Sequence, residues 1–210
     1  HVRDAYVHYM RSGGFALIHT GIYSMEDVYQ IIYDVYSSVI LRDTIQRHKI
    51  RDIELLERVV KFIFDNIGSK FSGKSVADYF KSQMRKVDIN TVYNYINALE
   101  SAYIIYRVPR YDIKGKEILK TQEKFYTADH SILYAVMGYR DHQISGILEN
   151  IVMHELLRRN YNVFTGKSGV HEIDFIGERK NKKVYVQVAY KMTEKKTIER
   201  EFRTLTDIKD

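Results

Sequence analysis

The chain has 210 residues, with 33 lysines and arginines against 27 acidic residues, and its formal net charge at pH 7 is +6. It contains no cysteine, which excludes a disulfide framework or a thiolate metal site and favours a reducing, cytoplasmic location. No apolar run is long enough for a membrane span, and no signal peptide begins the chain. The positive charge favours polyanionic partners without requiring them.

The N-terminal part predicts a helical segment. The chain starts with histidine rather than methionine, so we interpret it as a fragment of a longer protein. Residues 1–50 are expected to be helical with a break at Gly13 and Gly14, and residues 27–41 carry apolar side chains at helical spacing. A charged stretch over residues 42–52 predicts a boundary.

The next segment, residues 51–110, predicts three short helices. Apolar residues repeat at helical spacing over residues 53–67, which predicts the first helix. The second helix is expected to be capped by Ser72, and the third by Asp88 or Asn90. A strand over residues 103–108, ended by Pro109, follows the third helix.

Three helices followed by a β-ribbon are typical of a winged helix-turn-helix, in which the third helix takes the recognition position. DNA binding would need basic side chains for phosphates and polar side chains for base edges. The alternative is that this segment packs against a protein domain. The nucleic-acid-binding candidates are Lys81, Arg85, Lys86, Asn90, Asn94, Asn97, Arg107 and Arg110.

Residues 111–210 predict a mixture of strands and helices. We expect a strand over residues 124–129, a helix over 144–160 and a β-hairpin over 171–190, followed by a helix over 194–205. The expected fold is therefore α+β, with a helical linker, a winged helix and an α/β domain.

The stretch from Gly68 to Ser75 matches the P-loop pattern G-x-x-x-x-G-K-S, with Lys74 and Ser75 as its last two residues. A working P-loop leaves a buried strand and enters a helix, but here the preceding residues repeat at helical spacing. No apolar strand ending in aspartate follows to hold magnesium. We interpret Gly68 as a helix stop and Ser72 as a helix cap, and we reject nucleotide binding at this motif.

The predicted hairpin places chemical side chains on one face. Side chains alternate along a strand and cross-strand partners share a face, so a turn at residues 180–181 sets Asp174 opposite Gln187. One face then carries Glu172, Asp174, Tyr185, Gln187 and Ala189, and the other carries Ile173, Phe175, Val184, Val186 and Val188.

An ordered set of short stretches resembles a prokaryotic family of predicted AAA-type ATPases. Its members carry a P-loop ATPase domain, then a winged helix, then a domain similar to PD-(D/E)XK nucleases. The stretches are YMRSGGF at 9–15, ILRD at 40–43, TVYNY at 91–95 with LE at 99–100, YTADH at 126–130, LEN at 148–150 and EIDF at 172–175. Ala16 stands where the family often has proline.

The resemblance implies three segments and a missing nucleotide site. Residues 1–50 would end the ATPase part, residues 51–110 would form the winged helix, and residues 111–210 would form a restriction-endonuclease-like domain truncated at its C-terminus. ATP and magnesium would bind in a domain outside this sequence, and that ATPase domain would be a partner of the chain. A second copy of the chain is a further expected partner, and a membrane is not.

The resemblance also implies a degenerate nuclease site. Glu149 would fill the helix position and Asp174 the first strand position, and both would hold Mg²⁺ if the site is active. Gln187 stands where a second carboxylate belongs, and Ala189 stands where the lysine belongs. We expect little or no cleavage; the alternative is a Mg²⁺-dependent nuclease in which Lys191, two residues further on, replaces the lysine.

Three further sites are weaker candidates. Glu155 could replace the helix ligand or form a surface salt bridge, and Asp129 with His130 could be an acid–base pair or structural. Arg42 could act as an arginine finger or be solvated. The sequence thus predicts the C-terminal region of an ATPase that binds nucleic acid or a protein partner, with a regulatory protein-interaction module as the alternative.

Overall fold

The computed structural model describes residues 1–83, 87–140, 143–168, 171–180, 182–190 and 205–206, which form an α+β fold. The chain divides into two compact units, which we call the helical unit and the sheet unit. The helical unit comprises His1–Asn66, Gly73–Tyr106 and Thr127–Asp141. The sheet unit comprises Ile67–Ser72, Arg107–Tyr126 and His142–Asp210.

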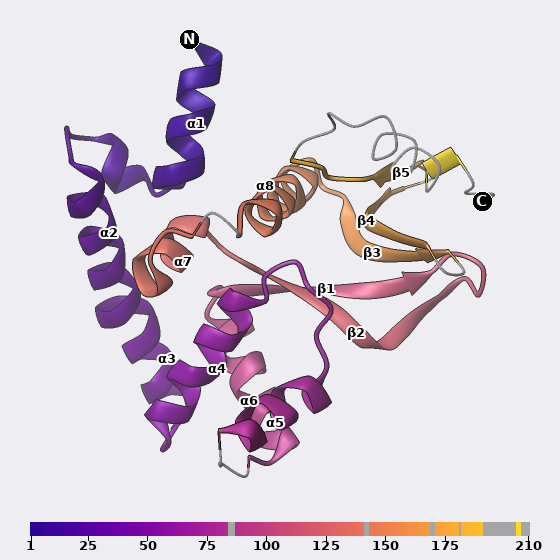
Figure 1. Cartoon of the computed structure of the whole chain (residues 1–210), viewed down its shortest axis with the longest axis horizontal. Helices are drawn as coiled ribbons and strands as arrows, with labels where there is room; N and C mark the ends of the chain where they lie inside the picture. The colour runs from indigo at the N-terminus through magenta and orange to yellow at the C-terminus, as the bar shows by residue number, and fades with distance from the viewer. Residues whose placement is uncertain (84–86, 141–142, 169–170, 181, 191–204, 207–210) are drawn as a thin grey trace. The chain divides into compact units, whose positions relative to one another are not determined.

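The helical unit consists of helices with short connections (Figure 1). Its elements are α1 (Val2–Ser12), the 3-10 helix η1 (Ala16–His19), α2 (Met25–Asp34), the π-helix η2 (Val35–Leu41), α3 (Arg42–Arg47), α4 (Ile53–Asp65), α5 (Gly73–Ser82), α6 (Ile89–Ser101) and α7 (His130–Met137). The helix predicted over residues 27–41 is therefore not a single α-helix, because its second half winds as a π-helix.

Side-chain caps set the beginnings of several helices. Asp52 accepts a hydrogen bond from the Leu55 N–H at the start of α4, and Asp88 caps α6 by accepting from the Asn90 N–H. These caps satisfy backbone donors that have no partner within the helix. Of the two caps predicted for the third helix, Asp88 or Asn90, the structure has Asp88.

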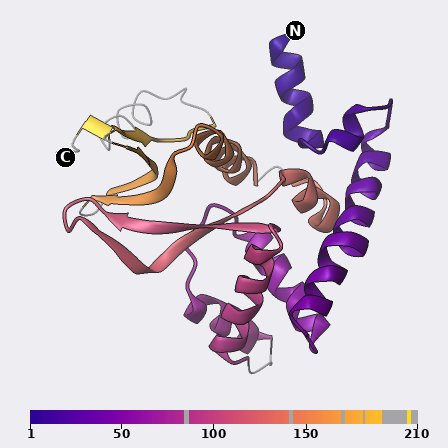
Figure 2. The same ribbon diagram turned by 180° about the vertical axis from the view of Figure 1, so that it is seen from behind.

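Apolar faces of the helices form the core of the helical unit. Helix α4 buries Leu56, Val59 and Phe64, and α6 buries Val92 and Leu99. Helix α6 packs against α4 and α5, while α2 packs along α7, as both views show (Figure 2). The burial of one stripe on each helix is what the helical spacing in the sequence predicts.

The sheet unit contains a five-stranded mixed sheet in the order β2-β1-β3-β4-β5. Strand β1 pairs with β3 in parallel, and β3, β4 and β5 pair antiparallel. Helix α8 packs against β3 and β4. The bounds are β1 Ile105–Asp112, β2 Glu117–Thr127, α8 Ile144–Arg158, β3 Asn162–Ser168, β4 His171–Arg179 and β5 Lys182–Val186.

The end of strand β1 differs from its prediction. Strand β1 does not end at Pro109 but continues to Asp112. Proline has no N–H to donate, and the pairing of β1 with β3 begins only at Arg110. Pro109 therefore precedes this ladder and does not interrupt it.

The β4–β5 hairpin has the predicted turn. Phe175 pairs with Val186 and Arg179 with Lys182, which leaves a two-residue loop. Tyr185, which was expected on the chemical face, instead packs against an apolar cluster that includes Ile176. The helix predicted over residues 194–205 lies almost wholly outside the described residues.

Among the described residues, no helix combines the length and apolar character needed to cross a membrane.

Candidate functional site

A buried lysine joins the two predicted nuclease carboxylates. Lys124 on β2 is 3% exposed, and its Nζ lies 3.2 Å from Oε2 of Glu149 on α8 and 3.4 Å from Oδ1 of Asp174 on β4. A third carboxylate, that of Glu172, has Oε1 3.5 Å from the same Nζ. The structure thus brings Glu149 and Asp174 together, with an ammonium group between them.

Neutral donors also form hydrogen bonds to these two carboxylates. The Tyr126 hydroxyl donates to Glu149 Oε2 at 2.8 Å, and the Val188 N–H donates to Asp174 Oδ2 at 2.9 Å. Gln187 lies beside Asp174 as predicted, and its Oε1 accepts from the Asp174 N–H at 3.3 Å. The amide oxygen that could have replaced a carboxylate ligand is therefore used by the backbone.

The segment before α5 closes one side of this cluster. Gly68 has φ +73, and a Cβ built there would lie 2.9 Å from Glu149 Oε2. Its N–H donates to the Phe125 carbonyl at 3.1 Å, which holds the segment along β2. Lys70 then pairs with Glu172. Glycine at this position is required both by the left-handed backbone and by the close carboxylate.

Burial and charge oppose each other in the cluster. Burial disfavours the charge on Lys124, but the three carboxylates outweigh it and raise its pKa above 10.5. Burial raises the pKa of Glu149 above 4.5, although Lys124 lowers it. The raised pKa of Lys124 favours its charged form, whereas the raised pKa of Glu149 favours its neutral form. We take both groups as charged at neutral pH, because Glu149 Oε2 accepts hydrogen bonds from two donors.

The cluster as arranged does not fit a divalent cation. An ion between Glu149 and Asp174 would have to lie where the Lys124 ammonium lies. The described residues also contain no group of three or more His, Cys, Asp or Glu side chains that could hold a metal ion. Lys191, the predicted replacement lysine, lies outside the described residues, and Ala189 carries no functional group.

Sequence reasoning missed Lys124. The residue stands between Glu123 and Phe125, both of which are also buried, so it lies in a strand that is covered on its two faces. A lysine within such a run is rarely buried unless it is paired. The aromatic residue that follows it, Phe125, was therefore the signal in the sequence that could have indicated a buried lysine.

The predicted recognition helix exposes a row of amides. Asn90, Asn94 and Asn97 are all exposed on α6, and their spacing of three and four residues puts them on one face. Lys81 is exposed near the end of α5. Arg85 and Lys86 lie outside the described residues.

A basic hollow adjoins this face of α6. It has a volume of about 460 Å³ and is lined by residues 48–51 and 94, 95, 97 and 98. Lys49 and Arg51 line it on one side, and Asn94 and Asn97 on the other. His48 ties the loop to α6 through a 2.9 Å hydrogen bond between its Nε2 and the Ser101 hydroxyl. Sequence reasoning treated these basic residues only as a boundary.

Two predicted nucleic-acid contacts fall in the sheet unit. Arg110 is 9% exposed and donates from its guanidinium to the Gln122 side-chain oxygen, so burial removes it from the accessible surface. Arg107 is half-buried, with its guanidinium 5.6 Å from the centroid of the Phe125 ring. These contacts stabilise the strand that was expected to form a wing.

Asp129 and His130 have structural contacts. Asp129 caps α7 by accepting from the Ser131 N–H at 2.8 Å, and it also accepts from the Gly14 N–H at 2.7 Å. The buried His130 ring has Nε2 2.8 Å from the Tyr9 carbonyl. These hydrogen bonds agree with the structural alternative for the pair.

The other weak candidates lie on the surface. Glu155 forms salt bridges with Arg158 and Arg159 at 2.7 and 2.6 Å, which match the alternative to metal binding. Arg42 is the exposed first residue of α3.

The P-loop match from Gly68 to Ser75 lies on a scaffold unlike that of a nucleotide site. Helix α4 precedes the motif instead of a strand. It ends at Asp65, two residues before the predicted end at residue 67, so Gly68 does not directly follow it. The motif runs into α5, which begins at Gly73, directly after Ser72. Lys74 and Ser75, which would contact phosphate and magnesium in a working P-loop, are both exposed in the first turn of α5. The rejection of nucleotide binding at this motif stays a prediction.

Known proteins resemble most of the chain. An uncharacterized protein of Haemophilus influenzae is 32% identical over 193 residues, which are 92% of this chain and 48% of that protein. Uncharacterized protein MJ1544 of Methanocaldococcus jannaschii is 28% identical over 175 residues, which are 79% of this chain and 37% of that protein. The chain therefore spans about half or less of the length of these relatives.

No solved structure matches the chain. A family model described as a domain of unknown function matches residues 3–143, which is more than half of the sequence. The chain therefore belongs to the family of the domain of unknown function DUF8612.

Proposed function

We propose that the chain is the DNA-binding C-terminal region of a larger P-loop ATPase. In this proposal α4, α5 and α6 carry the helix-turn-helix, and the sheet unit is a nuclease-like domain without cleavage activity. The observation that carries DNA binding is the hollow between the exposed amides of α6 and the basic residues 48–51.

The chemistry of this hollow suits duplex DNA. Lys49 and Arg51 carry the positive charge that phosphates attract, and Arg51 can hold a phosphate with two parallel hydrogen bonds. Asn94 and Asn97 present amide groups, which can pair with the edge of adenine in the major groove. A complex with DNA needs phosphate contacts and base contacts. The cations of residues 48–51 can make the first kind, and the exposed amides of α6 can make the second.

Lys124 supports the proposed absence of cleavage. Its ammonium balances the charge of Glu149 and Asp174 without a metal ion, and their remaining contacts go to a hydroxyl and a backbone N–H. An active nuclease would need this lysine to leave the cluster. A metal ion would then have to replace the ammonium at both carboxylates, because leaving them buried and unpaired is costly.

The proposal of a larger ATPase is supported by the family resemblance and by the length of the relatives. The relatives are about twice as long as this chain or longer, so they have room for a separate nucleotide-binding domain. ATP and Mg²⁺ would bind in that domain. The exposed Lys74 and Ser75 within α5 would take no part in binding them.

Binding of a labelled duplex, followed by fluorescence anisotropy over a range of salt concentrations, tests the DNA proposal. We expect the affinity to fall with salt, and Lys49→Ala and Arg51→Ala each to lower the log–log slope by roughly 0.9. Lys61→Ala is the matched control, because Lys61 lines a different hollow of the same unit. A salt-independent affinity, or no binding, would favour a protein partner instead.

Incubation of labelled DNA and RNA with the chain and Mg²⁺ or Mn²⁺ tests the absence of cleavage. We expect no product from the wild-type chain. Product that disappears in the Asp174→Ala variant would overturn the proposal in favour of an active nuclease. Product that persists in that variant would come from a contaminating enzyme.

A further inference from the structure

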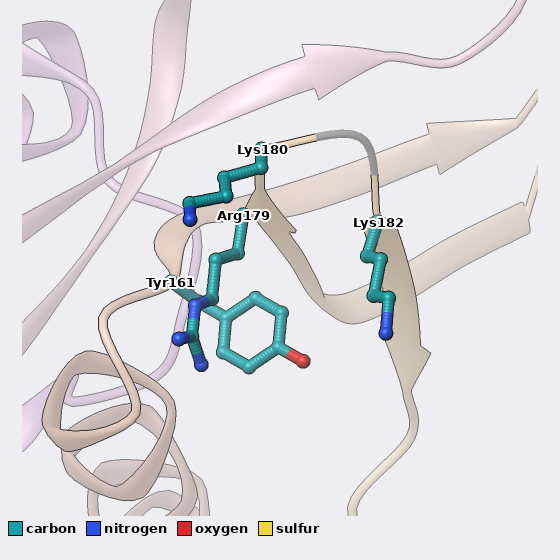
Figure 3. A pocket seen from close by; sticks show the side chains of 4 residues that line it. All are labelled: Tyr161, Arg179, Lys180 and Lys182. Carbon is teal, nitrogen blue, oxygen red and sulfur yellow. The ribbon is translucent and has the colours of Figure 1, made fainter.

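A second basic hollow lies at the turn of the β4–β5 hairpin, within the sheet unit. It has a volume of about 650 Å³ and is lined by Tyr161, Arg179, Lys180 and Lys182 (Figure 3). Three of its four lining side chains are cations, and these three are exposed. The hollow is separate from the Lys124 cluster and shares no lining residue with the hollow beside α6.

The pairing of the hairpin places two of the cations against each other. Arg179 and Lys182 are direct cross-strand partners. Like charges in this position destabilise a sheet. The next pair, Glu178 with Lys183, has complementary charges. The unfavourable pair is therefore confined to the face that lines the hollow, where an anion would compensate it.

Contacts with the backbone hold Arg179 and Tyr161 in place beside the hollow. Arg179 donates from Nη1 to the Arg159 carbonyl at 3.1 Å, which fixes the guanidinium while most of its five N–H donors point elsewhere. Gly177 allows the Tyr161 ring to lie against β4, since a Cβ there would come within 3.1 Å of Tyr161 Cδ1. In Figure 3 the ring lies between Arg179 and Lys182, with its hydroxyl on the Lys182 side.

We infer that this hollow binds a phosphate group. A guanidinium offers paired donors to two phosphate oxygens, and two ammonium groups can neutralise the charge of a terminal phosphate. The Tyr161 hydroxyl adds a donor, and its ring provides a surface on which a base can stack. The phosphate can belong to the end of a nucleic-acid strand or to a free nucleotide. The inference goes beyond binding at α6 and does not depend on it.

Titration of the chain with four probes distinguishes the sources. The probes are inorganic phosphate, ADP, a short single-stranded oligonucleotide with a 5′-phosphate and the same oligonucleotide without it. Binding is measured by isothermal titration calorimetry and by the NMR shifts of the Tyr161 and Arg179 amides. Binding of ADP and inorganic phosphate assigns a free phosphate ligand. Preference for the phosphorylated oligonucleotide alone assigns a strand end.

The matched variants are Lys182→Glu and Lys183→Glu, which change the same charge at neighbouring positions on opposite faces of β5. We expect Lys182→Glu to weaken binding at least roughly tenfold, and Lys183→Glu to change it less. Arg179→Gln should weaken it comparably. Equal effects of the two glutamate variants, or no binding of any probe, would overturn the inference. Circular dichroism and thermal unfolding verify that each variant folds.

Discussion

Gly14 donates its backbone N–H to Asp129 Oδ2 at 2.7 Å, across 115 positions of sequence. The neighbouring Gly13 has φ +75, and a Cβ built there would lie 2.1 Å from Asp129 Oδ1. Asp129 therefore links the end of α1 to the beginning of α7 at a distance that only glycine permits. Two stretches that carry the family resemblance, residues 9–15 and 126–130, form one structural joint.

Replacement of Gly13 by alanine should destabilise the helical unit strongly. Positive φ alone costs roughly 1–2 kcal/mol for an L-residue, and the clash with Asp129 adds roughly 1–3 kcal/mol of overpacking. We expect the free energy of unfolding, measured with urea, to fall by at least about 2 kcal/mol.

Gly138→Ala is the matched control for this variant. Gly138 has φ +77, but a Cβ there would meet nothing within 4 Å. It should therefore show the backbone cost without the steric cost. Equal losses in the two variants would mean that the contact with Asp129 contributes nothing.

The sequence predicted local features better than the chemistry of the site. Asp88 caps α6, and the β4–β5 turn falls at the predicted residues, because caps and turns depend on adjacent residues. Lys124 was missed, since its partners Glu149 and Asp174 lie 25 and 50 positions away. Pairing over such distances depends on how β2, α8 and β4 pack, and periodicity does not report it.

Removal of the Lys124 charge should destabilise the sheet unit. The variant Lys124→Met keeps most of the side-chain volume but leaves Glu149 and Asp174 buried without their cation. We expect a loss of roughly 3–5 kcal/mol in the free energy of unfolding. Lys70→Met is the control, because the side chain of Lys70 is 39% exposed and pairs with the half-buried Glu172. A solvated pair is worth about 1 kcal/mol or less, so comparable losses would contradict the central role of Lys124.

The pH dependence of stability should report Glu149. Burial raises its pKa above 4.5 and the Lys124 ammonium lowers it, so its pKa in Lys124→Met should be higher than in the wild type. A raised pKa means that the folded state takes up this proton first as the pH falls. The stability deficit of Lys124→Met should therefore shrink as the pH is lowered from neutral toward 4.5.

Two measurements follow this titration, namely urea unfolding over that pH range and the carboxyl carbon shift of Glu149 by NMR. The double variant Lys124→Met with Glu149→Gln is the control, because it removes the titrating group. A deficit that does not change with pH in the single variant would contradict the predicted rise of the Glu149 pKa in Lys124→Met.

Within the P-loop match, Gly68 should contribute to stability, whereas Lys74 should contribute neither to stability nor to nucleotide binding. Gly68→Ala combines φ +73 with an approach of 2.9 Å to Glu149 Oε2, so we expect a loss of about 2 kcal/mol or more. Lys74→Ala changes an exposed helix residue and should alter stability by less than about 0.5 kcal/mol. Calorimetry with ATP and Mg²⁺ should detect no binding that Lys74→Ala or Ser75→Ala removes. Loss of nucleotide binding in either variant would make the motif a working P-loop.

Lys124→Ala should open a metal site that the wild-type chain lacks. Alanine removes the ammonium group that contacts both Glu149 and Asp174. It leaves space between their carboxylates. Carboxylate oxygens are suitable ligands for Mn²⁺, and a metal that binds only the folded state stabilises it. Excess Mn²⁺ should therefore raise the melting temperature of Lys124→Ala but not that of the wild type. The double variant Lys124→Ala with Asp174→Asn should lose this response. An equal increase in the wild-type chain would show that Lys124 does not block the site.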